Sequence, residues 1–168
     1  GSFFTRGTSR NEYAIYTEDV DEYTHNMDRL LKKWETAKDY VPAPEIINCG
    51  SASNIGIIHF GTSMDATLEA VDYLVEEGYQ VDSCRIKAFP FNKDVEKFIA
   101  EHETIFVVEQ NRDAQMRSLL VNECDIDPKR LIKILNFDGM PIAARLIQAR
   151  VNESINTDNV TPLHRKRN

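Results

Sequence analysis

The residues best suited to chemistry follow a short apolar run near the middle of the chain. Residues 105–108 are Ile, Phe, Val and Val, a composition typical of a strand that is buried on both faces of a parallel sheet. Glu, Gln, Asn and Arg follow directly at 109–112. Ligands and partners of open α/β sheets gather at the carboxyl ends of the strands, so these four residues could form a binding site. A solvated turn is the alternative. Asp113 is expected to cap the helix that follows.

A second candidate is the turn formed by Gly61, Thr62 and Ser63, which follows an apolar run at 55–60. Its backbone amides could face an anion, although an ordinary helix cap explains the same residues. The dinucleotide fingerprint and the P-loop are absent, and Ser63 is not in a nucleophile elbow. These residues predict no self-sufficient active site.

The remaining reactive residue types are scattered. The four histidines show no metal-ligand spacing, and His59, inside an apolar strand, is expected to be a hydrogen-bonded core residue. The three cysteines lie far apart and cannot complete the four-cysteine set of a common iron–sulfur cluster. No metal site is predicted, and a reducing, cytoplasmic compartment fits this cysteine usage.

Charge and hydropathy exclude further classes of function. The 168 residues include 20 Lys and Arg against 27 Asp and Glu, which gives a net charge of −7. This balance argues against nucleic-acid binding that rests on neutralising phosphates. No apolar run reaches the length of a membrane span, and no signal peptide is recognised, so no membrane partner is expected.

The alternating pattern of the chain indicates the elements that position the candidate residues. An amphipathic helix is expected to begin at Thr17 or Asp19 and to run to Val41, where two prolines end it. Strands are then expected near 46–48, 55–60, 80–89, 104–109 and 131–135, alternating with helices. Four or five strands alternating with helices predict a three-layer α/β/α domain with a mainly parallel sheet over 45–155, and we take the sheet to be five-stranded. An extended connector and the long helix occupy 1–44, and a flexible tail occupies 156–168.

Finer expectations concern the helices. Leu68, Val71, Leu74 and Val75 should face the core from a helix at 64–77, with Gly78 just beyond its end. Pro141 is suited to be the first residue of the last helix.

Five blocks in order resemble one protein family. They read RGTSRNEY at 6–13 with YTED at 16–19, DR at 28–29 with KWETA at 33–37, IIHFGTS at 57–63, RIKAFPF at 85–91, and VEQNRDAQ at 108–115. Together they resemble the C-terminal part of the alpha subunit of 2-oxoacid:ferredoxin oxidoreductases, with the 2-oxoglutarate type (2-oxoglutarate synthase) the nearest likeness. The resemblance runs from about residue 3 to about residue 151. Because the sequence has no initiator methionine, the chain is expected to be a piece of something longer.

The resemblance implies an enzyme that oxidatively decarboxylates a 2-oxoacid to an acyl-CoA and reduces ferredoxin. Thiamine diphosphate, Mg²⁺ and a [4Fe-4S] cluster would belong to the complete enzyme and not to this chain. The chain would be the transketolase C-terminal-like domain and its connector. Its expected partners are the upstream pyrimidine-binding domain and the beta subunit, with coenzyme A and ferredoxin serving the complex. The isolated chain would be inactive.

The resemblance also places residues. It puts Arg6, Arg10, Asn11 and Glu12 in the connector near an interdomain cleft, where an arginine could contact a carboxylate or phosphate. It also puts Gln110, Asn111 and Arg112 at a strand end facing the catalytic domains. A purely structural contact between domains is the alternative role for these three residues. No catalytic residue is expected in the chain. Two other functions stay open: the C-terminal domain of a transketolase-like or 2-oxoacid dehydrogenase beta chain, and a non-catalytic α/β interaction module.

Overall fold

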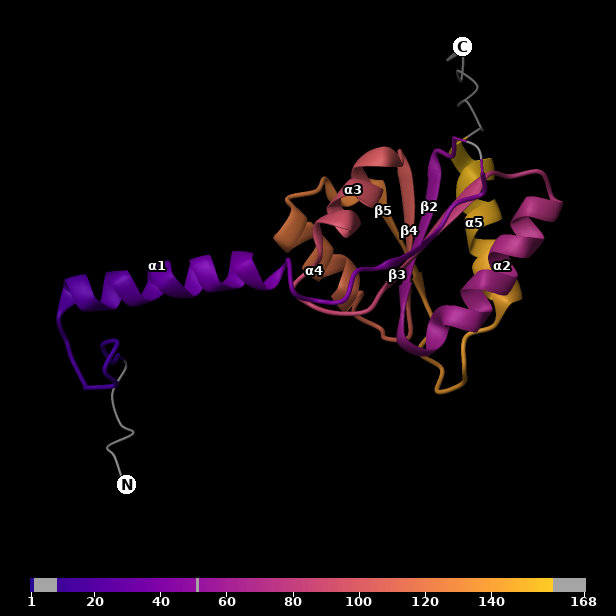
Figure 1. The fold of residues 1–168 in the computed structure, drawn as a ribbon. Coiled ribbons are helices and arrows are strands. Elements are labelled where there is room, and N and C mark those ends of the chain that lie inside the picture. Colours follow the sequence, from indigo (N-terminus) through magenta and orange to yellow (C-terminus); the bar gives the residue numbers. More distant parts are fainter. Residues whose placement is uncertain (2–8, 51, 159–168) are drawn as a thin grey trace, which may run out of the picture. The chain divides into compact units, whose positions relative to one another are not determined.

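The computed structural model describes residues 1, 9–50 and 52–158, so Arg6 lies outside the described residues. The chain divides into two compact units, residues 1–41 and residues 42–168. The first unit contains the helix α1 (Val20–Ala37), and the second contains the sheet and the other helices (Figure 1).

In the first unit, a short turn precedes α1. Asn11 Oδ1 accepts hydrogen bonds from the backbone N–H groups of Tyr13 and Ile15, which closes the turn. The Asp19 carboxylate accepts from the N–H groups of Asp21 and Glu22, both at 3.0 Å, so the predicted start of the helix is confirmed. No residue of α1 is buried.

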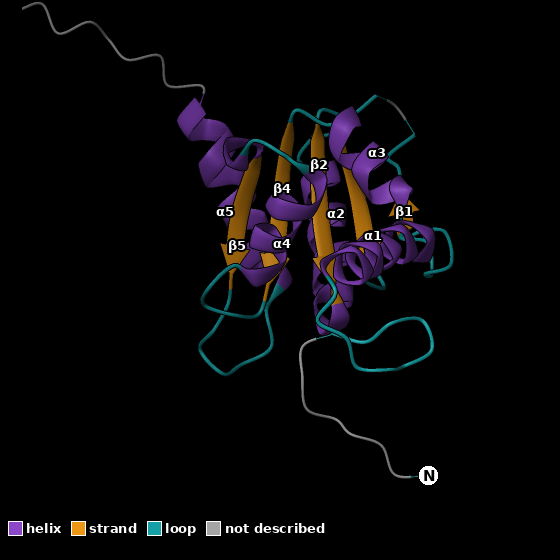
Figure 2. Ribbon diagram, turned by 90° about the vertical axis from the view of Figure 1, so that its left-hand side faces the viewer, coloured by secondary structure: helices purple, strands orange, loops and turns teal. Residues whose placement is uncertain are grey.

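The second unit is built on a five-stranded sheet with the order β1-β3-β2-β4-β5. The strands are β1 (Glu45–Ile47), β2 (Ile55–Phe60), β3 (Val81–Ile86), β4 (Thr104–Glu109) and β5 (Leu131–Leu135). All neighbouring pairs are parallel except β1 with β3, which is antiparallel. Figure 2 shows β2 and β4 side by side in the middle of the sheet.

Helices cover both faces of the sheet. They are α2 (Met64–Glu76), α3 (Lys93–Glu101), α4 (Gln115–Cys124) and α5 (Ala144–Asp158). The helices α2 and α5 lie on one face, and α3 and α4 lie on the other (Figure 1). Successive residues of a strand point to opposite faces, so Ile57 packs in the first core layer and Ile58 in the second. The predicted three-layer, mainly parallel α/β/α fold is confirmed.

Three local predictions fail, and each failure has a physical reason. In α2, Val75 is 47% exposed, whereas Thr67, Ala70 and Leu74 are buried. These three residues lie three and four positions apart on one face of the helix, and Val75 lies off that face. The last helix begins at Ala144 and not at Pro141, since the preceding segment is held by a side chain from another turn. Asp113 does not cap α4 either.

The helix boundary signal at Gly78 is confirmed. Gly78 has a φ of +95°, and the N–H of Tyr79 bonds to the carbonyl of Leu74 across it.

Among the described residues no helix combines the length and the hydropathy that crossing a bilayer requires.

Candidate functional site

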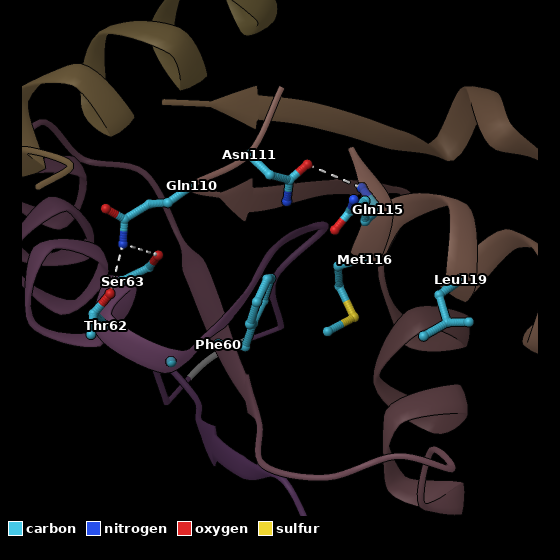
Figure 3. A pocket seen from close by; sticks show the side chains of 9 residues that line it. Phe60, Thr62, Ser63, Gln110, Asn111, Gln115, Met116 and Leu119 are labelled. Carbon is cyan, nitrogen blue, oxygen red and sulfur yellow. Dashed lines mark hydrogen bonds between the residues drawn. The ribbon is translucent and has the colours of Figure 1, made fainter. Parts of the chain in front are cut away.

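A pocket opens at the point where the connections that follow two neighbouring strands run to opposite faces of the sheet. The chain leaves β2 toward α2 on one face, and it leaves the adjacent β4 toward α4 on the other face. Such a switch point at the carboxyl ends of parallel strands is where open α/β sheets bind ligands and partners. A pocket of about 570 Å³ lies here, and both candidate turns of the sequence analysis line it (Figure 3).

The walls of the pocket come from two segments. One is the end of β2 with the short 3₁₀ turn Gly61–Ser63 that follows it. The other is the end of β4 with the start of α4, which contributes Gln110, Asn111, Gln115, Met116 and Leu119. None of the described lining residues carries a charge. The pocket therefore suits a neutral group that combines apolar surface with hydrogen-bonding atoms.

Gln110 joins the turns that surround the pocket. Its Nε2 donates to Thr62 Oγ1 at 2.9 Å and to Ser63 Oγ at 3.2 Å. Its Oε1 accepts from the backbone N–H of Ile142 at 3.2 Å. One side chain at the end of β4 thus ties together the turns after β2, β4 and β5, as the dashed lines to Thr62 and Ser63 show (Figure 3).

Glu109 holds the start of α4. Its carboxylate is fully buried and accepts from the N–H groups of Met116 at 2.8 Å and Arg117 at 2.9 Å and from Asn111 Nδ2 at 2.7 Å. These bonds satisfy two of the N–H groups that a helix leaves open at its first turn. The prediction that Asp113 caps this helix is wrong, because the carboxylate that closes it comes from the end of the strand.

Asn111 completes this arrangement, and Arg112 does not take part in it. Asn111 Oδ1 accepts from the N–H groups of Asp113 at 3.1 Å and Gln115 at 3.3 Å. The side chain of Arg112 is 75% exposed and pairs with the adjacent Asp113, with Nε 2.8 Å from Oδ1. Of the three residues predicted at this strand end, two line the pocket and Arg112 points to solvent.

The turn Gly61–Ser63 stays a predicted anion site and nothing more. Gln110 donates to the hydroxyl oxygens of Thr62 and Ser63, and no cationic side chain lines the pocket in the described part of the chain. These hydroxyls are thus engaged within the protein, and the role of the backbone amides of the turn stays a prediction.

The connector residues make local contacts. Arg10 Nη1 donates to the carbonyl of Ala14 at 3.1 Å, and Asn26 Nδ2 donates to the carbonyl of Arg10. Asn11 shapes the turn described above, and Glu12 is exposed. Their predicted role near an interdomain cleft stays a prediction.

Two histidines occupy the interior of the second unit. His59 is buried in β2, and burial, with a smaller effect from the charge of Arg85, lowers its pKa to about 4. It is buried as predicted, but its Nδ1 has no hydrogen-bond partner. His102 follows α3, with Nε2 3.1 Å from Asp82 Oδ2 and Nδ1 2.6 Å from the carbonyl oxygen of Phe98. No group of three metal-ligating side chains is found among the described residues.

Comparison with known proteins identifies relatives of the chain, although no protein-family model matches it. It is 24% identical over 155 residues to the alpha subunit of 2-oxoacid:ferredoxin oxidoreductase 2 from Aeropyrum pernix, covering 90% of this chain and 24% of that protein. It is 28% identical over 140 residues to the 2-oxoacid:ferredoxin oxidoreductase alpha subunit of Saccharolobus solfataricus, covering 81% and 22%. The chain thus spans about a quarter of the length of these curated relatives.

Solved structures agree on the fold. The 2-oxoglutarate:ferredoxin oxidoreductase of Magnetococcus marinus, solved with 2-oxoglutarate, coenzyme A and succinyl-CoA bound, matches 92% of this chain and 27% of its own with a TM-score of 0.78 at 22% identity. A split-gene transketolase, solved as an inactive beta4 tetramer, matches 67% of this chain and 41% of its own with a TM-score of 0.54 at 14% identity. The predicted resemblance to the alpha subunits and the transketolase C-terminal-like fold are confirmed.

Proposed function

We propose that the chain is the C-terminal part of the alpha subunit of a thiamine-dependent 2-oxoacid:ferredoxin oxidoreductase. The observation that carries the proposal is the similarity to two 2-oxoacid:ferredoxin oxidoreductase alpha subunits over at least 81% of the chain. The complete enzyme would convert a 2-oxoacid and coenzyme A into an acyl-CoA and carbon dioxide while reducing ferredoxin. The five sequence blocks and the substrate named for the Magnetococcus marinus enzyme favour 2-oxoglutarate as the 2-oxoacid.

The cofactors of this reaction belong elsewhere in the complete enzyme. A [4Fe-4S] cluster needs four thiolates, whereas the chain has three cysteines, and burial raises the pKa of the Cys84 thiol to about 12. Thiamine diphosphate needs Mg²⁺ bound to its diphosphate, and the pocket has no acidic side chain to hold the metal. The three cysteines do not fit the cluster, and the described residues that line the pocket do not fit the metal-bound diphosphate.

The role proposed for the chain is to dock against the catalytic parts of the enzyme through the carboxyl edge of its sheet. The pocket lies on this edge, and so does the loop after β5, where Phe137 is 63% exposed and Met140 is 68% exposed. Asn136 Nδ2 bonds to the carbonyl of Met140 at 2.8 Å, which holds this loop in a defined shape. Large apolar side chains presented on an ordered loop suit a protein interface. The upstream pyrimidine-binding domain and the beta subunit are the proposed partners.

The decisive experiment uses the native gene product, purified anaerobically with its associated subunits. We expect brown, iron-containing material that reduces a low-potential acceptor when both a 2-oxoacid and coenzyme A are supplied, with 2-oxoglutarate tested first and pyruvate second. A colourless single chain that is inactive after addition of thiamine diphosphate and Mg²⁺ would contradict the proposal and favour the interaction module.

The docking role has its own test in the complete complex. We expect Arg112→Ala to weaken subunit assembly or turnover, because its exposed guanidinium lies beside the pocket at the carboxyl edge. Arg150→Ala is the matched control, since Arg150 is also exposed and paired, with Glu153, but lies on α5. Size-exclusion chromatography and the acceptor assay measure the two outcomes. Unchanged assembly and turnover in Arg112→Ala would refute a role for this residue in docking or catalysis.

A further inference from the structure

A second, much smaller cavity lies between the sheet and α2, beneath the edge strand β1. It measures about 10 Å³, and Met64 and Leu68 of α2 close it on one side. His59 of β2 and Ser83 of β3 face it from the sheet. This volume corresponds to about one water-sized sphere, so the cavity is too small for an organic ligand.

Two polar atoms at this cavity have no hydrogen-bond partner. His59 Nδ1 and Ser83 Oγ are both unpaired, and each residue is only 1% exposed. Nearly all buried polar atoms of folded proteins are hydrogen-bonded to protein or to ordered water. Two unpaired atoms that face one cavity therefore call for a shared partner inside it.

The chemistry of the two groups defines that partner. His59 stays neutral near pH 7 because its pKa is lowered to about 4, so its ring has one nitrogen that accepts a hydrogen bond. The hydroxyl of Ser83 can either donate or accept. Glu45 and Arg85 also line the cavity, with the Arg85 guanidinium 3.4 Å from the Glu45 carboxylate. Either group can supply a third partner. A water molecule, with two donors and two acceptor sites, satisfies this set, whereas a metal ion would lack ligands.

We propose that this cavity binds a single buried water molecule, which donates to His59 Nδ1 and bonds to Ser83 Oγ. The donation to Nδ1 places the ring proton on Nε2. The water joins the side chains of β2 and β3 on the α2 face, one residue before Phe60 and the turn that forms the wall of the larger pocket.

A crystal structure of the chain at about 1.5 Å resolution tests the proposal directly. We expect one density peak within hydrogen-bond distance of both His59 Nδ1 and Ser83 Oγ. An empty cavity, or a direct hydrogen bond between Ser83 Oγ and His59 Nδ1, would overturn it. Nitrogen chemical shifts of His59 near pH 7 provide a second measurement, since the proposal requires the Nε2–H tautomer and the opposite tautomer contradicts it.

A double-mutant cycle tests the same bridge in solution. Ser83→Ala removes one of the water's partners, so the unfolding constant should rise by about tenfold. In a His59→Phe background the bridge is already lost and the Ser83 hydroxyl is buried without its partner. Ser83→Ala should then leave the unfolding constant unchanged or lower it. An equal effect in both backgrounds contradicts a shared partner. Ser118→Ala is the control, because the Ser118 hydroxyl donates to the carbonyl of Ala114, the residue before α4, and should show no coupling to His59.

Discussion

Replacing Glu109 with Gln should test how the candidate site is built. The carboxylate is fully buried, with Oε2 accepting from Met116 N and Asn111 Nδ2 and Oε1 accepting from Arg117 N. Glu109→Gln keeps the shape of the side chain but turns one acceptor into a donor. In its best orientation the amide oxygen keeps the first two bonds, and its NH₂ group then faces the N–H of Arg117.

The expected cost follows from these contacts. A hydrogen bond to a charged group contributes about 1.5 to 3 kcal/mol. Glu109→Gln loses one such bond and weakens two others. Part of this loss is offset because the neutral amide is less costly to bury than the carboxylate. We therefore expect the free energy of unfolding to fall by about 2 to 3 kcal/mol. Urea denaturation followed by circular dichroism measures it.

Asp113→Asn is the matched control, because Asp113 is the residue that the sequence pattern assigns as the cap. Its carboxylate is exposed and, within the described residues, pairs with Arg112, an interaction typically below about 1 kcal/mol. The variant should change the free energy of unfolding by less than about 0.5 kcal/mol. A Glu109→Gln variant as stable as the wild type, or an Asp113→Asn variant as unstable as Glu109→Gln, would refute the assignment of the cap.

Three further perturbations probe the same domain. As pH falls from 6.5 to about 4, the unfolded chain protonates His59 before the folded one does, so this residue should cost about 3 kcal/mol of stability, measured by urea denaturation across that range. Gly56→Ala would place a Cβ 2.8 Å from the buried ring of Phe98, and we expect a loss of about 1 to 3 kcal/mol in the same assay. Gln110→Leu removes its bonds to Thr62, Ser63 and Ile142, which should cost about 2 kcal/mol and raise amide hydrogen exchange at Ile142.

Each perturbation has a control within the chain. The acid-dependent loss should be smaller in His59→Gln, and an identical pH profile would contradict the buried neutral imidazole. Gly61→Asn tests a glycine with φ of +58° and open space around it, a conformation that Asn tolerates, so it should be nearly neutral. Gln115→Leu changes a side chain on the same pocket and should leave stability within about 0.5 kcal/mol. If a control matches its partner variant, the residue-specific explanation fails.

The sequence predicts the elements well because their signals are local. The run at 55–60 and the run at 131–135 are β2 and β5 with the bounds that their apolar residues indicate. Asp19 begins its helix as expected, and Asn92 likewise caps α3, since an N-cap needs only the residues that immediately follow it. The two candidate turns also lie on one pocket, because neighbouring parallel strands end at the same edge.

The failures come from contacts that cross between elements. Asp113 fits the local signature of a cap, but Glu109 lies seven positions before Met116, outside any capping pattern read from the sequence. A usable signal was the position of Glu109 at the end of an apolar strand, since a buried carboxylate requires several donors. Pro141 fails for a similar reason: Gln110 holds Ile142 from a different turn, and the helix begins only afterwards.

β2 lies in the middle of the sheet, although it is the first of the four parallel strands to be synthesised. It pairs with β3 on one side, but its other edge stays open until β4 has been translated. A nascent chain that ends before residue 104 therefore leaves Ile57 and Ile58 without the packing that Phe106 and Val107 supply through pairing. The open edge of β2 can pair with other chains during this interval, so it is a site of intermolecular strand pairing in the nascent chain.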